Sequence, residues 1–441
     1  MTLSDATSPP SVVATTPLSD AQRRRSLRAS TAGNILEWYE WTTYSALSPF
    51  IAKAMFASSD PSAALLSVFA VFAVGFLMRP IGGVVFGIIG DRIGRRAVLI
   101  STMLSMAAAC LAIGLLPTYA SIGIWSSALL LLLRCIQGFA HGGESSASAT
   151  YVSEIAPPAH RGLWGSAAGT AIIGGSLFSF LVSAALTSVL GADAMQEWGW
   201  RIPFLLGGVM AVVVLWMRRE MHESDVFTET QAEENDPVEP PARRAVVLAA
   251  VRLIAFIAGL TCFNYVWMTF MTTYAISEKG MSPGAAYWVT ALGQLICLVI
   301  TPFMGRLSDR IGRKPMMFGY AALAVIITFP FTALVNDQPW TLFVTVTAGL
   351  SIWAMCNSIF PALLAENFPT RLRGRGVGFS YSIAVALFGG TAPYLNQLFV
   401  SLDKGWVFNL YVMGLCSIGF VATFFFKETR GINLNDVRLD R

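Results

Sequence analysis

The sequence predicts an all-α membrane protein of about twelve transmembrane helices, arranged as two pseudo-symmetric halves of six helices each. Of its 441 residues, 55% are hydrophobic and only 13% are charged. A soluble chain of this length would need roughly twice that share of charge to cover its surface. Apolar stretches long enough to cross about 30 Å of hydrocarbon recur along the whole length. We therefore expect the chain to pack against the lipid bilayer.

A charged motif that occurs twice predicts the two halves. The first copy, Gly87 to Arg96, and the second, Gly305 to Lys314, share the pattern Gly-x-x-x-Asp-Arg-x-Gly-Arg-Arg/Lys. Each lies between two apolar runs, so we expect a tight charged turn between two membrane helices. A second pattern also recurs at identical spacing: Glu154, Pro157 and Arg161-Gly162 match Glu366, Pro369 and Arg373-Gly374. Offsets of 218 (309 minus 91) and 212 (366 minus 154) residues imply homologous halves.

The apolar runs give approximate spans for each helix. Those of the first half are residues 32–55, 64–88, 97–116, 121–148, 162–190 and 200–217, and those of the second are 246–276, 284–304, 315–335, 341–364, 376–400 and 405–427. The resulting domains are a disordered tail (1–31), a first half (32–218), a linker (219–245), a second half (246–428) and a C-terminal tail (429–441). The first tail is rich in Ser, Thr, Ala and Pro without an apolar stretch, and the linker is polar.

The basic residues predict the orientation of the chain. They gather before the first span and in alternate loops, which places both termini in the cytoplasm under the positive-inside rule. We expect a monomer in the plasma membrane, and the basic clusters need no nucleic-acid partner because they coincide with membrane flanks. The six cysteines lie inside apolar spans, so we expect neither disulfides nor a metal site.

Polar residues inside the first span point to proton chemistry. Asn34, Glu37, Trp41 and Tyr44 are spaced by three and four residues, with Glu40 beside them, so they share one inward face. Two carboxylates one turn apart repel each other, which favours a proton on at least one of them, as a proton carrier requires. Alternatively, Glu37 pairs permanently with an arginine and only holds helices together.

The fourth span carries a polar stripe with helical period. Arg134, Gln137, His141, Glu144 and Ser148 lie on one side, which must face a cavity or another helix. Arg134 suits a substrate carboxylate or a nearby glutamate, since its guanidinium can form two parallel hydrogen bonds. His141 could relay protons near neutral pH, or it could simply be hydrogen-bonded.

Further polar groups predict the rest of a substrate site. Arg79 lies inside the second span, where it could bind substrate or serve as a structural counter-ion for a first-half glutamate. The second half has few buried charges but supplies Asn264, Trp267, Asn357 and Tyr381. We therefore expect proton chemistry in the first half (Glu37, Glu40, Glu144 and His141) and hydrogen bonding to the substrate in the second. The predicted substrate-binding residues are Arg79, Arg134, Gln137, Tyr44, Asn264, Trp267, Asn357 and Tyr381.

The paired loops resemble the signature of the major facilitator superfamily, from residue 32 to 428. Further motifs make the chain similar to its metabolite:proton symporter family: Gly33-Asn34-x-x-Glu37-Trp38-Tyr39-Glu40, Gly75 to Gly83, Gln137-Gly138-Phe139-x-x-Gly142-Gly143-Glu144, Glu197 to Phe204 and Phe388 to Pro393. That family includes permeases for α-ketoglutarate, citrate, shikimate and proline or betaine. The resemblance implies alternating access between the two halves.

The resemblance also implies that the loops form a cytoplasmic gate. Its residues would be Gly87, Asp91, Arg92, Gly94, Arg95, Arg96, Gly305, Asp309, Arg310, Gly312 and Arg313, extended by Glu154 with Arg161 and by Glu366 with Arg373. An aspartate can accept hydrogen bonds at a helix end, and the arginines can meet carboxylates on neighbouring helices, so the contact would be a breakable latch. A role limited to membrane topology would not account for glycines and an aspartate repeated in register.

These features predict a secondary transporter rather than an enzyme. The sequence contains no Gly-x-x-x-x-Gly-Lys-Ser/Thr loop for ATP, no nucleophile, metal cluster or cofactor loop, so energy must come from an ion gradient. Three membrane arginines, Arg79, Arg134 and Arg201, favour a small organic acid of the α-ketoglutarate or dicarboxylate kind. Alternatively, Trp38, Tyr39, Trp41 and Tyr44 could form a cage for a zwitterion such as proline or betaine. A remote alternative is a sensor on the same fold that transports nothing.

Overall fold

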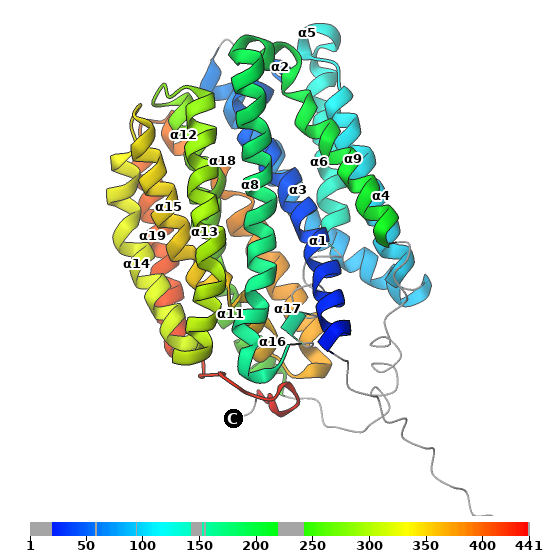
Figure 1. Cartoon of the computed structure of the whole chain (residues 1–441), viewed down its shortest axis with the longest axis vertical. Helices are drawn as coiled ribbons and strands as arrows, with labels where there is room; N and C mark the ends of the chain where they lie inside the picture. The colour runs from blue at the N-terminus through cyan, green and yellow to red at the C-terminus, as the bar shows by residue number, and fades with distance from the viewer. Residues whose placement is uncertain are drawn as a thin grey trace, which may run out of the picture.

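The computed structural model describes residues 20–57, 60–93, 95–142, 152–153, 156–218 and 242–439 of the chain. Long helices run nearly side by side through the molecule (Figure 1). Helices of this kind satisfy every backbone hydrogen bond internally, as a hydrocarbon surrounding requires.

The first half consists of six helical spans. They are α1 (Asp20–Ala46) with its continuation α2 (Ser48–Met55), α3 (Pro61–Ile93), α4 (Arg95–Leu115), α6 (Ile124–His141), α8 (Arg161–Ala194) and α9 (Arg201–Arg218). The short helix α5 (Tyr119–Ile122) precedes α6, and a π-helical turn, η2 (Met195–Gly199), joins α8 to α9. The first span is interrupted at Leu47, whose backbone departs from helical geometry (ψ 6°).

The second half repeats this plan, with several spans interrupted. They are α11 (Arg243–Tyr265) continued through the π turn η3 (Val266–Phe270) into α12 (Met271–Ser277), α13 (Pro283–Ile311), α14 (Arg313–Leu334), α15 (Pro339–Asn357) continued as α16 (Phe360–Glu366), α17 (Thr370–Ala384) continued through η4 (Val385–Gly389) into α18 (Ala392–Ser401), and α19 (Gly405–Phe424). The break between α15 and α16 directly follows Asn357, and Pro361 cannot continue the hydrogen-bond ladder.

The spans confirm the predicted architecture. Within the described residues, 9 helical segments are long and apolar enough to cross a membrane, and Ile100–Leu115 and Arg201–Leu215 are shorter apolar helices. With α1, whose apolar stretch holds Glu37 and Glu40, they make the twelve helices of two six-helix halves. The chain is a multi-pass membrane protein. Five of its six free cysteines are buried and Cys135 is half-buried, in keeping with their expected role as small core residues.

The two halves meet along α8 and α13, which lie side by side at the centre of Figure 1. Near one end, a Cβ atom added to Gly162 would lie 2.7 Å from the Gly305 carbonyl oxygen, and one added to Gly305 would lie 2.6 Å from the Gly162 oxygen. Only glycine permits so close an approach, and small residues let membrane helices pack backbone to backbone. The repeated glycine of the second motif copy is therefore a packing residue between the halves.

The second motif copy turns the chain tightly between α13 and α14. Gly312 adopts a φ of 106°, in the left-handed region that glycine occupies without strain. We call the end of the bundle that holds this turn the motif end, and the other the opposite end. The motif end is at the bottom of Figure 1, where the C-terminal segment also lies. Within that segment, Leu434 and Val437 pack on Ala365 of α16.

The predicted domain boundaries differ from the helices at two places. The first helix begins at Asp20, before the expected boundary at residue 32, because the preceding residues include good helix formers such as Arg and Ala. The predicted C-terminal tail (429–441) includes residues that pack against α16 at the motif end. Most of the predicted linker, residues 219–241, lies outside the described residues, so its extent stays a prediction.

Candidate functional site

Two adjoining cavities lie between the halves, near the middle of the bundle. One is lined by Asn34, Glu37, Trp38, Ala168, Gly169, Ile172, Asn357, Phe360, Pro361 and Tyr381. The other is lined by Trp38, Ile172, Ile257, Leu260, Thr261, Asn264, Tyr265, Trp353, Asn357, Phe360, Tyr381 and Val385. Five residues line both, so the cavities form one continuous site, which we call the central cavity. It draws on α1 and α8 of the first half and on α11, α15, α16 and α17 of the second.

A cluster of ionisable side chains borders the central cavity on the first-half side. Glu37 on α1 lies 3.8 Å from the Arg79 guanidinium on α3 and 3.5 Å from His141 Nδ1 on α6. All three side chains are buried, and the Arg79 guanidinium also lies over the rings of Trp41 and Phe76. Burying ionisable groups in a bilayer costs several kcal/mol, which a cluster of opposite charges partly offsets. The sequence-predicted counter-ion contact between Arg79 and Glu37 is therefore present, at the edge of the cavity.

Arg134, which the sequence predicted to meet a substrate carboxylate or a nearby glutamate, lies apart from the cavity. Arg134 is 1% exposed, donates a hydrogen bond to Gln137 (2.8 Å) and interacts electrostatically with Glu40. Its guanidinium is covered by the rings of Trp41 and Tyr44, at 4.2 and 4.0 Å from the ring centroids. Cation–π contacts of this kind stabilise a desolvated guanidinium by up to about 2 kcal/mol. Arg134 and Gln137 therefore share one hydrogen bond inside the first half, while Arg134 Nε and Nη2 and Gln137 Nε2 form none within the described residues.

The four aromatic residues proposed as a cage do not surround one space. Trp38 lines the cavity and stacks against Tyr265, with ring centroids 6.0 Å apart. Tyr39 turns away and donates a hydrogen bond to the Pro203 carbonyl, whereas Trp41 and Tyr44 cover the protein's own arginines. Their side chains leave α1 in different directions because consecutive residues on a helix are about 100° apart. Of the four, only Trp38 is placed to contact a ligand in the central cavity.

The second half contributes uncharged polar groups to the cavity, as the sequence predicted. Asn264 on α11 and Asn357 at the end of α15 are 3% and 2% exposed. The Asn264 Oδ1 and Asn357 Nδ2 atoms are buried and form no hydrogen bond within the described part of the structure. Tyr381 on α17 also lines the cavity. The remaining predicted binding residue of this half, Trp267, is fully buried against Gly349 and does not line either cavity.

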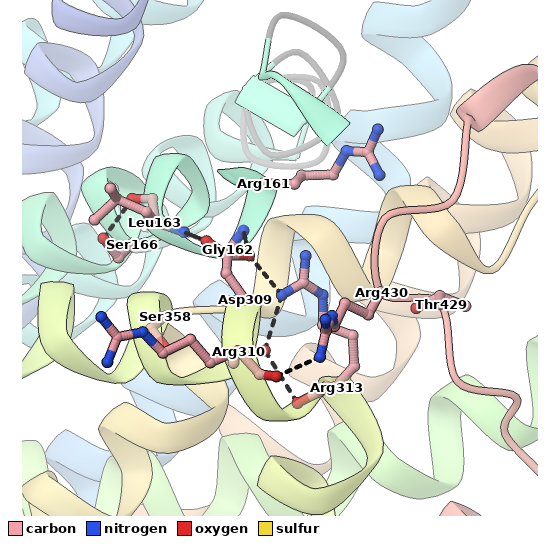
Figure 2. Close-up of polar contacts among 12 residues, drawn as sticks. Arg161, Gly162, Leu163, Ser166, Asp309, Arg310, Arg313, Ser358, Thr429 and Arg430 are labelled. Carbon is pink, nitrogen blue, oxygen red and sulfur yellow. Dashed lines mark hydrogen bonds and ion pairs between the residues drawn. The ribbon is translucent and has the colours of Figure 1, made fainter. Parts of the chain in front are cut away.

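At the motif end, a carboxylate of the second half caps a helix of the first. Asp309 on α13 accepts hydrogen bonds from the backbone N–H groups of Gly162 (2.8 Å) and Leu163 (2.9 Å) at the start of α8 (Figure 2). The N-terminus of a helix carries unpaired N–H groups and a partial positive charge, both of which attract a carboxylate. Asp309 also pairs with Arg313 at 2.9 Å. The Asp309 carboxylate thus joins the two halves.

A buried ion network extends this contact. Arg161 at the start of α8 donates to Glu366 of the second half at 2.9 Å, and Arg313 reaches the same carboxylate at 3.4 Å. Thr429 donates a third hydrogen bond to Glu366 (2.6 Å), and the Ile432 carbonyl accepts one from Arg161 (3.0 Å). These groups come from four segments: the start of α8, the end of α16, the start of α14 and the C-terminal segment that holds Thr429 and Ile432. Opening the motif end would have to break the bonds between Arg161 and the second half together.

The opposite end is also bridged, at the interruption between α1 and α2. Tyr287 on α13 donates to the Ala46 carbonyl at 2.8 Å, and Thr273 on α12 donates to the Ser45 carbonyl at 3.2 Å. These carbonyls are available because the helix ladder breaks at Leu47. Beyond them, Trp288 donates to Ser188 of α8 at 3.0 Å. The central cavity therefore lies between two sets of bonds that connect the halves.

Several predicted site residues cannot be placed. Glu144, Glu154 and Gly94 lie outside the described residues. The backbones of Gly87, Asp91, Arg92, Arg95, Arg96 and Arg373 lie in helices, but their side chains are outside the part of the chain that the structure describes. The remaining gate residues, Arg310 and Gly312, lie at the α13–α14 turn, where the Arg310 carbonyl accepts a hydrogen bond from Arg430 (Figure 2).

Known proteins with this architecture match along nearly the whole chain. The family model of the Major Facilitator Superfamily matches residues 31–393. The chain belongs to the Major Facilitator Superfamily. It is 37% identical over 430 residues to the alpha-ketoglutarate permease of Escherichia coli (strain K12), covering 96% of this chain and 99% of that protein. This membership confirms the resemblance that the repeated motifs indicated.

Other relatives are named for different substrates. The ectoine/proline transporter ProP of Corynebacterium glutamicum is 34% identical over 434 residues, covering 92% of this chain and 84% of that protein. The citrate-proton symporter of Salmonella typhi is 34% identical over 417 residues, covering 91% and 94%. Among solved structures, the proton:xylose symporter XylE bound to 6-bromo-6-deoxy-D-glucose has a TM-score of 0.76, with 95% and 99% of the two chains covered. At 18% identity, that likeness shows the major facilitator fold alone.

Some site residues of this major facilitator chain were not predicted from sequence. Tyr265 and Gly169 line the cavity, but an aromatic residue and a glycine in apolar spans carry no signal of their own. Glu428 accepts hydrogen bonds from the backbone N–H groups of Arg313 and Lys314 at 2.8 and 3.0 Å, so it caps α14. Its position just after the last span, next to Thr429 and Arg430, was the available signal for a role at the motif end.

Proposed function

We propose that this protein is a secondary active transporter that carries a small organic acid together with protons across the plasma membrane by alternating access. The names of its relatives, which include an alpha-ketoglutarate permease and a citrate-proton symporter, support both the cargo and the coupling ion. We further propose that the motif end faces the cytoplasm together with both chain termini, in line with the basic residues of the motif loops.

The observation that carries the proposal is the position of Glu37. It lies at the edge of the central cavity, within 3.8 Å of Arg79 and 3.5 Å of His141. A proton on Glu37 would remove the negative charge that holds Arg79, and the guanidinium could then attract an incoming carboxylate. Proton and anion would therefore bind together, since each makes the site more favourable for the other. This linkage is what symport requires.

The bonds at the two ends supply the alternating gates. At the motif end these are the Asp309 cap on α8 and the Arg161–Glu366 pair; at the opposite end they are the bonds to the Ser45 and Ala46 carbonyls. Each set consists of a few hydrogen bonds and ion pairs, whose individual net contributions are about 0.5–3 kcal/mol. Contacts of that size can be broken and remade as the halves rock about the central cavity.

Reconstitution tests the proposal directly. The purified protein in proteoliposomes, given an inward proton gradient, is expected to accumulate labelled organic acids from a panel that includes α-ketoglutarate and citrate. Collapse of the gradient with a protonophore should reduce accumulation to equilibration. The proposal fails if no member of the panel enters above the level of empty liposomes, or if the protonophore leaves accumulation unchanged.

A zwitterionic osmolyte such as proline or betaine is the second candidate. Trp38 and Tyr265 offer aromatic faces in the cavity, and Glu37 offers a carboxylate that could meet a ligand ammonium group. The ectoine/proline transporter among the relatives supports this reading. Unlabelled α-ketoglutarate and unlabelled betaine are compared as inhibitors of the uptake of a labelled substrate. The comparison separates the two candidates, because uptake through a site for one compound should be inhibited poorly by the other.

A further inference from the structure

The central cavity has two chemically different ends. Around Glu37 it adjoins the ion cluster with Arg79 and His141, so a charged group of the ligand can be neutralised there. Around Asn264 and Thr261 the wall is uncharged. Among the described residues that line the two cavities, Glu37 is the only Asp, Glu, Lys, Arg or His. Asn357 lines both cavities and lies where the ends meet.

Two buried carboxamides, one at the uncharged end and one where the ends meet, carry polar atoms without a partner. Asn264 and Asn357 are at least 97% buried (3% and 2% exposed), yet Asn264 Oδ1 and Asn357 Nδ2 form no hydrogen bond within the described residues. Buried carboxamides are nearly always hydrogen-bonded, because an unpaired buried donor or acceptor costs about 1–3 kcal/mol. An asparagine side chain offers both donors and an acceptor, whichever way the amide is turned. These two side chains are therefore built to pair with a ligand group that both accepts and donates.

Among the described residues that line the uncharged end, none is a cation that could pair with a second carboxylate. Arg134 is covered by Trp41 and Tyr44 and hydrogen-bonded to Gln137, and it does not line the cavity. Arg79 lies at the other end, beside Glu37. A carboxylate can accept hydrogen bonds from the two amide groups, but it leaves their carbonyl oxygens unpaired and its own charge uncompensated. A hydroxyl or carboxamide can pair with both the NH₂ donor and the C=O acceptor of an asparagine side chain, and it carries no charge to desolvate.

From this asymmetry we infer that Asn264 and Asn357 bind a neutral hydrogen-bonding group, so that the preferred cargo is a monocarboxylate bearing hydroxyl or amide groups rather than a dicarboxylate. The inference rests on the proposed function for the carboxylate end of the cargo. It goes further in assigning the chemistry of the other end. The second half thus selects the cargo by hydrogen bonding, whereas the first half supplies charge.

A matched pair of ligands tests the inference with the full-length protein. The dicarboxylate 2-oxoglutarate and its monoamide 2-oxoglutaramate have nearly the same shape and differ in the charge of one end. Binding is measured by thermal stabilisation in detergent, and transport by acidification of the lumen of proteoliposomes that contain a pH-sensitive dye, which registers proton entry even when a monoanion and one proton carry no net charge. The monoamide is expected to half-saturate both signals at a concentration about tenfold or more below that of the dicarboxylate, since sites built for hydrogen bonding discriminate strongly.

Variants locate the preference. Asn264→Ala and Asn357→Ala should each weaken binding of the monoamide by about tenfold and change binding of the dicarboxylate much less. The control Asn409→Ala removes an asparagine whose amide already bonds to Thr332 at 2.8 Å, and it should leave the preference intact. If an alanine variant fails to fold, Asn264→Ser and Asn357→Ser serve in its place, because serine keeps a hydroxyl and only shortens the side chain.

The outcomes separate this inference from the proposed function. Equal or tighter binding of the dicarboxylate, equal weakening of both ligands in the variants, or binding of neither ligand overturns the inference. Preferential binding of the monoamide without any acidification of the lumen upholds it and instead contradicts proton-coupled transport. Acidification with the dicarboxylate alone contradicts the inference and leaves the proposed transport of organic acids standing.

Discussion

At the scale of single residues, the two glutamates of α1 have different surroundings. Glu37 reaches the cavity, while Glu40, one turn of α1 later, is 1% exposed and interacts with Arg134. The Arg79–Glu37 distance of 3.8 Å is longer than a direct hydrogen bond. A pair held at that distance can be loosened by a proton or a ligand more easily than the short Arg161–Glu366 pair at 2.9 Å.

Replacement of Glu37 should uncouple transport from protons. Glu37→Gln keeps the shape of the side chain but cannot exchange a proton, so we expect gradient-driven accumulation to fall by about 100-fold. Exchange of labelled for unlabelled substrate, which needs no net proton movement, should continue. Both are measured in proteoliposomes, with Asp337→Asn, an exposed loop substitution, as the control. Normal accumulation by Glu37→Gln would contradict the role of this residue.

A glycine should control the position of a binding residue. A Cβ atom at Gly169 would lie 2.7 Å from the Asn357 Nδ2 atom, which is the free end of a side chain and can turn away. Gly169→Ala should therefore leave the protein folded and lower its apparent substrate affinity by about tenfold, as loss of one hydrogen-bonding group would. Gly414→Ala is the control, because a Cβ there meets no atom within 4 Å. Unchanged affinity in Gly169→Ala would show that Asn357 does not contact substrate.

At the scale of elements, α8 carries three functions along its length. Its start is capped by Asp309 and anchored by Arg161, its middle lines the cavity at Gly169, and Ser188 bonds to Trp288 near its end. Gly162 and Gly169 are about 10 Å apart along the helix axis. A rigid helix can therefore transmit a change at either end to the cavity without a change in its own secondary structure.

Loss of the Asp309 cap should open the motif end. Removing a helix cap costs about 0.5–2 kcal/mol, which would raise the open population by about 2- to 30-fold. Asp309→Ala is tested through the maleimide-labelling rate of a cysteine introduced at Ser166, a buried residue at the α8–α13 contact, in a Cys135→Ser background. Asp436→Asn, an exposed carboxylate at the same end, is the control. A labelling rate that does not rise would argue against Asp309 as a gate residue.

Loss of the Tyr287 hydroxyl should open the opposite end instead. Tyr287→Phe removes one buried hydrogen bond to the Ala46 carbonyl, worth about 0.5–1.5 kcal/mol, so we expect a cysteine at Ser45 to react about 2- to 10-fold faster. Tyr320→Phe provides the matched control, because that hydroxyl bonds to the Gly259 carbonyl inside the second half. Equal effects of the two substitutions would mean that the Tyr287 bond does not hold the halves together.

At the scale of the whole molecule, the two sets of bonds should act against each other. In an alternating-access protein, a variant that opens one end lowers the population in which the other end is open. Asp309→Ala should therefore slow labelling at Ser45, and Tyr287→Phe should slow labelling at Ser166. The four rates are measured in the same preparation. Acceleration at both positions by a single variant would indicate general loosening of the bundle instead.

Much of the fold was predictable because its signals are local. Spans follow from apolar length and the halves from the repeated motif, and most helix ends lie within a few residues of the predicted ones, except that α1 begins at Asp20 instead of residue 32. The polar residues of the first span were recognised as one inward face, but their partners were not. Trp41 and Tyr44 were expected around a ligand, whereas they cover Arg79 and Arg134. The direction in which a side chain leaves its own helix follows from the local sequence. The side chain that it contacts depends on which other helix packs there.

By itself the sequence determined that this chain crosses the membrane repeatedly in two related halves with buried charge in the first. Composition and periodicity suffice for that, because lipid admits few backbone structures. Only the tertiary structure decided that Glu37 meets Arg79 and His141 beside the cavity, that Arg134 is closed off, and that Asp309 caps a helix of the other half. These contacts join residues far apart in the chain, and their existence depends on how helices pack, which no local pattern encodes.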